Sequence, residues 1–80
     1  MTHVQVLYFA SLRDAAGVDS EVVDGDVADL RALYEGRRQR HRFALPVSQL
    51  RVAVDGAFAR WDDAPRNGSE VAFIPPVSGG

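Results

Sequence analysis

The residues best placed to take part in a chemical reaction are the last six of the sequence, Pro75-Pro76-Val77-Ser78-Gly79-Gly80. Proline cannot continue a sheet ladder and favours an extended polyproline exit, so Pro75 and Pro76 are predicted to hold a tail, residues 75–80, clear of the domain formed by residues 1–74. Gly79 and Gly80 lack a Cβ and can thread a narrow channel into another protein's active site. The pattern predicts that Gly80 presents its α-carboxylate on a thin stalk. A linker or a chance ending remains the alternative.

Side chains inside the domain offer little chemistry of their own. All nine basic residues are arginine and cysteine is absent, which excludes thiolate metal sites, a cysteine nucleophile or persulfide carrier, and a lysine Schiff base. His3 and His41 have no partner at metal-ligand spacing, so no metal site is expected. The serines lack the G-x-S-x-G context of a hydrolase, and Asp62-Asp63 is typical of a turn. Nothing inside the domain therefore indicates an active site.

Charge and hydropathy limit the classes of partner. The net charge of −2 argues against binding nucleic acid through its phosphates. The basic run Arg37–Arg42 could dock a phosphate or an acidic partner, although such a run is more typical of a solvated helix end. The longest apolar run, residues 6–10, is far too short to span a membrane, and no signal peptide is visible. We expect a soluble, cytoplasmic domain.

Apolar periodicity and turn residues predict the elements that must position the tail. Asp26 is the expected N-cap of the main helix, and Ser11 that of a short helix that Gly17 ends. Asp55-Gly56 is typical of a type I′ hairpin turn. The predicted strands are 3–9, 20–23, 50–54, 57–61 and 70–74, and the predicted helices are 12–16 and 26 to about 38–40.

This element order predicts an α+β fold, a β-grasp or ubiquitin-like roll. About five strands would form one mixed sheet packed on one main helix, with a short extra helix. A ferredoxin-like split βαβ is the alternative, but it expects a second long helix between the later strands, and none is visible.

Strand alternation predicts an apolar patch on the face of the sheet away from the main helix. If Val4, Val6 and Tyr8 face the helix, the intervening side chains face outward. The same argument applied to the hairpin and the last strand gives an outward set of Leu7, Phe9, Phe58 and Ile74. A small monomer rarely shows such a patch without a binding partner. The alternative is that one parity is wrong, or that a bulge shifts it, and these residues belong to the core.

Three segments carry a family resemblance over nearly the whole chain. VQVLYFASLRDAAG (4–17), VAVDG (52–56) and NGSEVAFIPPVSGG (67–80) resemble the small, sulfur-carrying subunit of molybdopterin synthase, a β-grasp family. The thiamine-pathway sulfur carrier ranks second, because it lacks the YFASLRDAAG segment. Ubiquitin-related protein modifiers rank third.

The resemblance implies a carrier chemistry at Gly80 and no catalysis by the subunit alone. An activating enzyme similar to ubiquitin E1 would adenylate Gly80 with ATP, and a persulfide donor would then convert it to a thiocarboxylate. No cofactor would be bound permanently. Within a synthase of two small and two large subunits, the sulfur would attack cyclic pyranopterin monophosphate. The resemblance also implies that apolar residues matching Phe9, Phe58 and Ile74 pack on the large subunit, and that the tail 75–79 threads into it.

Overall fold

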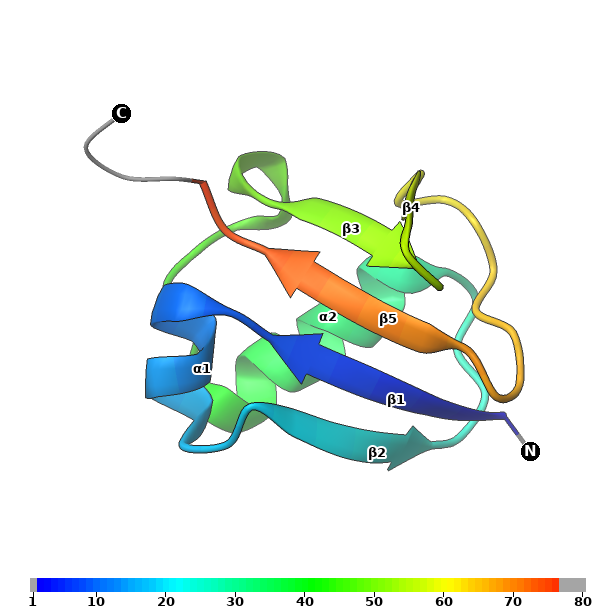
Figure 1. The fold of residues 1–80 in the computed structure, drawn as a ribbon, viewed down its shortest axis with the longest axis horizontal. Coiled ribbons are helices and arrows are strands. Elements are labelled where there is room, and N and C mark those ends of the chain that lie inside the picture. The colour runs from blue at the N-terminus through cyan, green and yellow to red at the C-terminus, as the bar shows by residue number, and fades with distance from the viewer. Residues whose placement is uncertain (1, 77–80) are drawn as a thin grey trace.

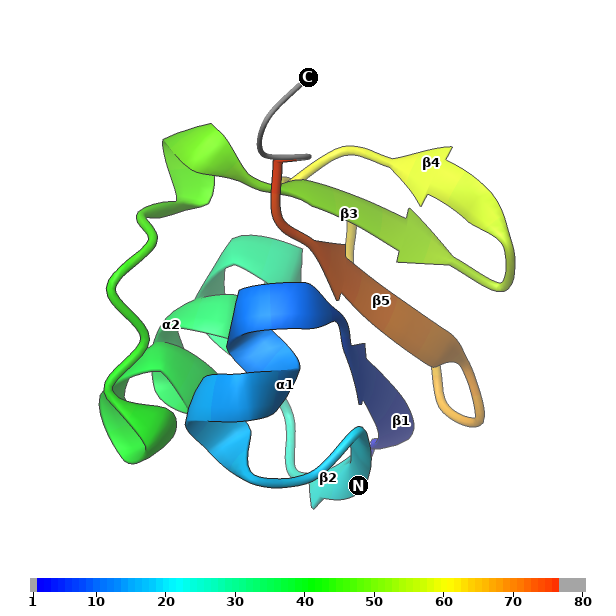
Figure 2. The same ribbon diagram turned by 60° about the vertical axis from the view of Figure 1, so that its left-hand side comes forward.

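A mixed β-sheet covered on one face by helices forms the part of the chain that the computed structural model describes, residues 2–76 (Figures 1 and 2). The strands are β1 (His3–Tyr8), β2 (Ser20–Asp24), β3 (Arg51–Val54), β4 (Ala57–Ala59) and β5 (Glu70–Ile74), and the helices are α1 (Ala10–Ala16), α2 (Leu30–His41) and the 3₁₀ turn η1 (Val47–Gln49). Within residues 2–76, no helix has the length and apolar character needed to cross a bilayer.

The sheet order is β2-β1-β5-β3-β4, which places the first and last strands side by side in the middle. β1 and β5 run parallel, whereas the other neighbouring pairs are antiparallel (Figure 1). The predicted hairpin between β3 and β4 is confirmed, since Asp55 (φ 51°) and Gly56 (φ 86°) both have the positive φ of a type I′ turn. The predicted β-grasp fold is confirmed.

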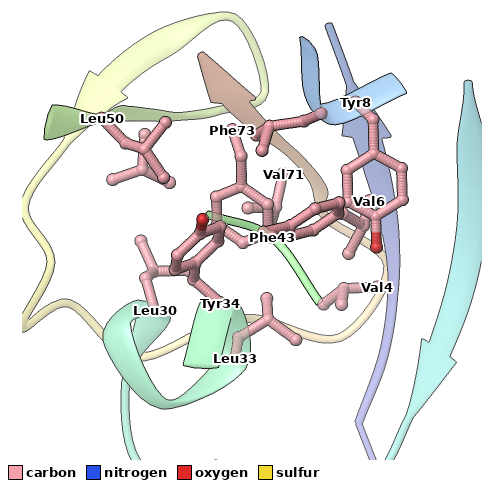
Figure 3. Packing of buried hydrophobic residues seen from close by; sticks show 12 residues of the cluster. Val4, Val6, Tyr8, Leu30, Leu33, Tyr34, Phe43, Leu50, Val71 and Phe73 are labelled. Carbon is pink, nitrogen blue, oxygen red and sulfur yellow. The ribbon is translucent and has the colours of Figure 1, made fainter. Parts of the chain in front are cut away.

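The core lies between the sheet and α2, and aromatic rings fill its centre (Figure 3). Tyr34 from α2 meets Phe73 from β5 edge to face, with ring centroids 5.1 Å apart. Trp61 stacks on the same Phe73 ring at 5.9 Å. β4 ends at Ala59, before the predicted limit at Trp61, because a turn in which Asp63 N donates to Arg60 O at 3.0 Å begins at Arg60.

α1 does not start as predicted. Ser11 is not its cap: the helix begins at Ala10, the N-cap position is Phe9, and no side chain caps it. Ala10 takes a left-handed φ of 51°, which turns the chain sharply between β1 and the helix. The predicted end is confirmed, because Gly17 has a left-handed φ of 78° and its N–H donates to Arg13 O.

The N-terminus of α2 lies one turn later than the expected Asp26 cap. Asp29 is the N-cap, and its carboxylate accepts from Ala32 N at 2.8 Å. Asp26 instead accepts from the backbone N–H and the hydroxyl of Thr2, both at 3.1 Å. Val27, inside the predicted helix range, precedes the observed helix and is exposed.

Remote backbone carbonyls complete that N-terminus. Leu30 N donates to Asp63 O at 2.9 Å and Arg31 N to Trp61 O at 3.0 Å. The loop that follows β4 thus satisfies helix N–H groups that would otherwise lack partners.

Candidate functional site

Four side chains on the open face of the sheet stand in one row across four strands. Leu7 on β1 is opposite Ala72 on β5, Ala72 is opposite Ala53 on β3, and Ala53 is opposite Phe58 on β4. Because α2 covers the other face, this row faces away from the helices (Figure 2). Two alanines in the middle and larger side chains at the ends make the row concave.

All four residues predicted to face outward line one hollow. Leu7, Phe9, Phe58 and Ile74 border a depression of about 310 Å³, together with Ala53 and Ala72. We call these six residues the open-face patch. Phe58 is 69% exposed and Phe9 45% exposed. The alternative that these residues are core is therefore wrong, and their role as a partner interface stays a prediction.

The root of the tail borders the same patch. Pro75 is buried and Pro76 is exposed, so Pro75 packs on the domain instead of standing clear of it. Both prolines line a second hollow, of about 380 Å³, which shares Phe58 and Ile74 with the first. Val77, Ser78, Gly79 and Gly80 lie outside the described residues, so their threading and carrier roles stay predictions.

Sequence reasoning missed one member of this region, Arg51. Its guanidinium carbon lies 5.5 Å from the centroid of the Phe58 ring, a cation–π contact. Arg51 is opposite Ile74 in the register of β3 and β5. The signal was present, because Arg51 has the same parity as Ala53 in an alternating strand.

A polar cluster, separate from the open-face patch, lies on the helix-covered side of the sheet. Glu21 on β2 accepts a hydrogen bond from the Tyr8 hydroxyl, lies 2.7 Å from His41 Nε2 and contacts Arg37 Nη1 at 3.5 Å. Arg37 and His41 belong to the basic run that was interpreted as a solvated helix end. For these two residues that interpretation is wrong, because both fold back onto Glu21.

Burial and hydrogen bonding shift the titration of this cluster. Burial raises the pKa of Tyr8 well above its ordinary value, and the hydrogen bond to the Glu21 carboxylate adds to the effect. Burial also acts to raise the pKa of Glu21. The hydrogen bonds from Tyr8 and His41 and the nearby positive charges outweigh it, so the pKa of Glu21 is lowered. The cluster fastens the end of α2 to β1 and β2, on the face opposite the patch.

The two histidines contact acidic side chains in two separate places, one carboxylate each. His3 contacts Asp24 at the start of β1, and His41 belongs to the Glu21 cluster. Across residues 2–76, no group of three or more His, Asp or Glu side chains could hold a metal ion.

A five-stranded mixed sheet with its last strand central and its helices on one face defines the class of ubiquitin-like β-grasp proteins. Within that class the chain belongs to the ThiS family, whose match spans residues 6–80.

Named relatives and solved structures agree with this assignment. The chain is 36% identical over 80 residues to the molybdopterin synthase sulfur carrier subunit of Haemophilus influenzae, covering 96% of this chain and 99% of the relative. A structure assigned as molybdopterin converting factor subunit 1 of Pyrococcus furiosus superposes with a TM-score of 0.83 at 32% identity, covering 96% and 100% of the two chains. SAMP1 of Haloferax volcanii, a small archaeal modifier protein, gives a TM-score of 0.81 at 27% identity, covering 98% and 99%.

Proposed function

We propose that this protein is the sulfur carrier subunit of a molybdopterin synthase. The observation that carries the proposal is the near-full-length similarity to a subunit of that name, with the family match running through Gly80. The open-face patch adds support, because it borders the root of the segment that would deliver the sulfur.

The proposed chemistry takes place at the α-carboxyl group of Gly80. A carboxylate is a poor electrophile, so an E1-like enzyme first joins it to AMP from ATP and releases pyrophosphate. The outer sulfur of a donor persulfide then attacks the activated carbonyl carbon and AMP leaves, which gives an acyl disulfide with the donor. A thiol attacks the donor sulfur of that disulfide, so that the thiocarboxylate is released and the thiol and the donor sulfur form a new disulfide. The sulfur is anionic at neutral pH because thiocarboxylic acids are much stronger acids than thiols, so it is ready to attack. ATP is consumed in the reaction and no cofactor stays bound.

The chain's own residues present the sulfur, and the partner supplies the catalytic groups. The open-face patch packs on the large subunit, while Pro75 and Pro76 direct residues 77–80 toward the active site of the large subunit. There the sulfur attacks cyclic pyranopterin monophosphate. Two small and two large subunits form the complex, which acts in the cytoplasm. The absence of cysteine from the sequence is consistent with sulfur carried on the main chain.

Intact-mass spectrometry tests the carrier step. The chain is incubated with ATP, the activating enzyme and a sulfide source, beside a control that lacks Gly80. We expect a mass gain equal to replacing one oxygen by sulfur, present only in the full chain. An active enzyme that leaves the full chain unchanged would remove the basis of the proposal.

Similarity to SAMP1 favours a second candidate, a protein modifier joined through Gly80 to amines of other proteins. Both functions begin with adenylation, so the product separates them. A carrier yields a thiocarboxylate, whereas a modifier yields isopeptide conjugates on lysines of other proteins. A binding measurement distinguishes the thiamine-pathway carrier, because that carrier does not act with the large subunit of molybdopterin synthase.

A further inference from the structure

The open-face patch is apolar in the middle and carries opposite charges at its two ends. Arg51 stands opposite Ile74, where β5 ends and the tail begins. Glu70 stands where β5 starts and borders the same hollow. Along β5 the position of Glu70 lies four residue steps from the position opposite Arg51, or about 13 Å. That distance exceeds the Debye length of about 8 Å at physiological salt, so the two charges address different groups on a partner.

The Arg51 side chain is available to form an ion pair with another protein. It is exposed, and among residues 2–76 no carboxylate forms an ion pair with it. Five other arginines also lack an ion pair within these residues, but none of the five lines either hollow. Its contact with the Phe58 ring holds the guanidinium beside the hollow that Pro75 and Pro76 line. The side chain thus offers a positioned fork of N–H donors at the edge of the patch, which suits a carboxylate.

An apolar patch alone does not fix how a partner is rotated upon it, because hydrophobic contact has no direction. The tail must nevertheless meet the mouth of a channel, so rotation matters for delivery. A charge at the tail end of the patch, with the opposite charge at the far end, supplies the missing direction. A partner docked the wrong way round would bring its carboxylate to Glu70, and such like-charge contacts are strongly unfavourable.

We propose that Arg51 is a specificity-determining residue that pairs with a carboxylate on the large subunit, at the mouth of the channel that receives the tail. This inference rests on the proposed function and adds the chemistry of the partner surface. The partner's surface is apolar opposite the patch and acidic opposite Arg51.

Charge reversal with a matched control tests the pairing. Binding of the purified large subunit encoded in the same genome is measured by calorimetry for the wild type, Arg51→Glu and Arg60→Glu. Both variants change the net charge equally, but Arg60 has an 82% exposed side chain, pairs with Asp62 and borders neither hollow. We expect Arg51→Glu to weaken binding at least about tenfold and Arg60→Glu to stay within about twofold of the wild type. Equal effects of the two reversals would overturn the proposal.

Two further variants test whether the position of the Arg51 charge matters apart from the net charge of the protein, and whether the charge matters apart from the contact with the Phe58 ring. Arg51→Glu combined with Glu70→Arg keeps the net charge, and we expect it to bind as weakly as Arg51→Glu. Arg51→Met keeps an apolar stem on Phe58 without the charge. We expect weaker binding at about 50 mM salt that converges with the wild type at about 500 mM. Wild-type affinity for Arg51→Met at both salt concentrations would overturn the proposal.

The failure of the wild type to bind the large subunit would have a different meaning. That result would contradict the proposed function, and the assignment of Arg51 would fall with it. If the wild type binds and Arg51→Glu binds equally well, only the assignment of Arg51 fails.

Discussion

His41 Nε2 lies 2.7 Å from Glu21 Oε1, which joins the last turn of α2 to the edge strand β2. The same carboxylate accepts from the Tyr8 hydroxyl, so Glu21 connects three elements at one point. Its side chain is only 22% exposed, and a group so placed is expected to contribute measurably to stability.

Stability should therefore fall in acid, and Glu21 should account for part of the loss. The pKa of Glu21 is lowered in the folded state, so its contribution is fully present above its ordinary pKa of 4.5 and is lost as the pH falls through the folded value. Urea unfolding from pH 7 to about pH 3 measures this dependence. Glu21→Gln should be less stable than the wild type at pH 7, and the difference should shrink in acid. A pH-independent difference would contradict the assignment.

Phe58→Asp should fold normally and lose binding to the large subunit. The ring is 69% exposed, so its replacement removes little from the core. Loss of a buried aromatic anchor from an interface costs about 2 kcal/mol or more, which is roughly 30-fold in affinity. Calorimetry measures the affinity and circular dichroism the melting. Val22→Asp is the matched control, because Val22 is 66% exposed and borders neither hollow. Unchanged affinity for Phe58→Asp would remove the patch from the interface.

Two glycine-to-alanine changes should shift stability in opposite directions. An added Cβ meets nothing within 4 Å at either Gly36 or Gly56, so packing is not involved. Gly36 lies inside α2, where alanine is favoured by about 1 kcal/mol. Gly56 has a φ of 86°, where alanine costs about 1 kcal/mol or more. Thermal and urea unfolding of both variants measures the shifts. Shifts of the same sign would contradict the backbone explanation.

Tyr34→Phe should destabilise the fold by about 1 kcal/mol. The hydroxyl donates to Leu45 O at 2.6 Å and ties the segment after α2 to the core. The ring contacts with Phe73 and Phe43 survive the change, so only the hydrogen bond is lost. Urea unfolding gives the free energy of unfolding. No change in that free energy would mean that the Leu45 carbonyl finds a new partner in the variant.

Local patterns sufficed for the existence of the five strands and for the hairpin, although not for the ends of β1 and β4, because alternation and turn chemistry are short-range signals. The alternation around Val6 and Phe73 identified the buried face, and Asp55-Gly56 identified the turn. The start of α2 needed remote information. Asp26 and Asp29 are equally good caps by type, and the choice depends on the carbonyls of Trp61 and Asp63, which lie far along the chain.

The same limit applied to the site. The outward parity of Leu7 and Phe58 follows from alternation, so the patch was predictable. The pairing of Arg37 and His41 with Glu21 was not, because it depends on how α2 crosses the sheet. Phe43 was equally hidden: it is buried because Arg42, with a left-handed φ of 59°, reverses the chain after the helix.

The central place of β5 determines how the domain responds to a pull on its tail. A force on the chain beyond Pro76 acts along β5, which is hydrogen-bonded to β1 on one side and β3 on the other (Figure 1). A pull along β5 loads the hydrogen bonds of both ladders in shear, whereas a strand at the edge of the sheet has only one ladder to hold it. The first and last strands thus form a mechanical clamp, and a partner can draw the tail inward without unravelling the domain that carries it.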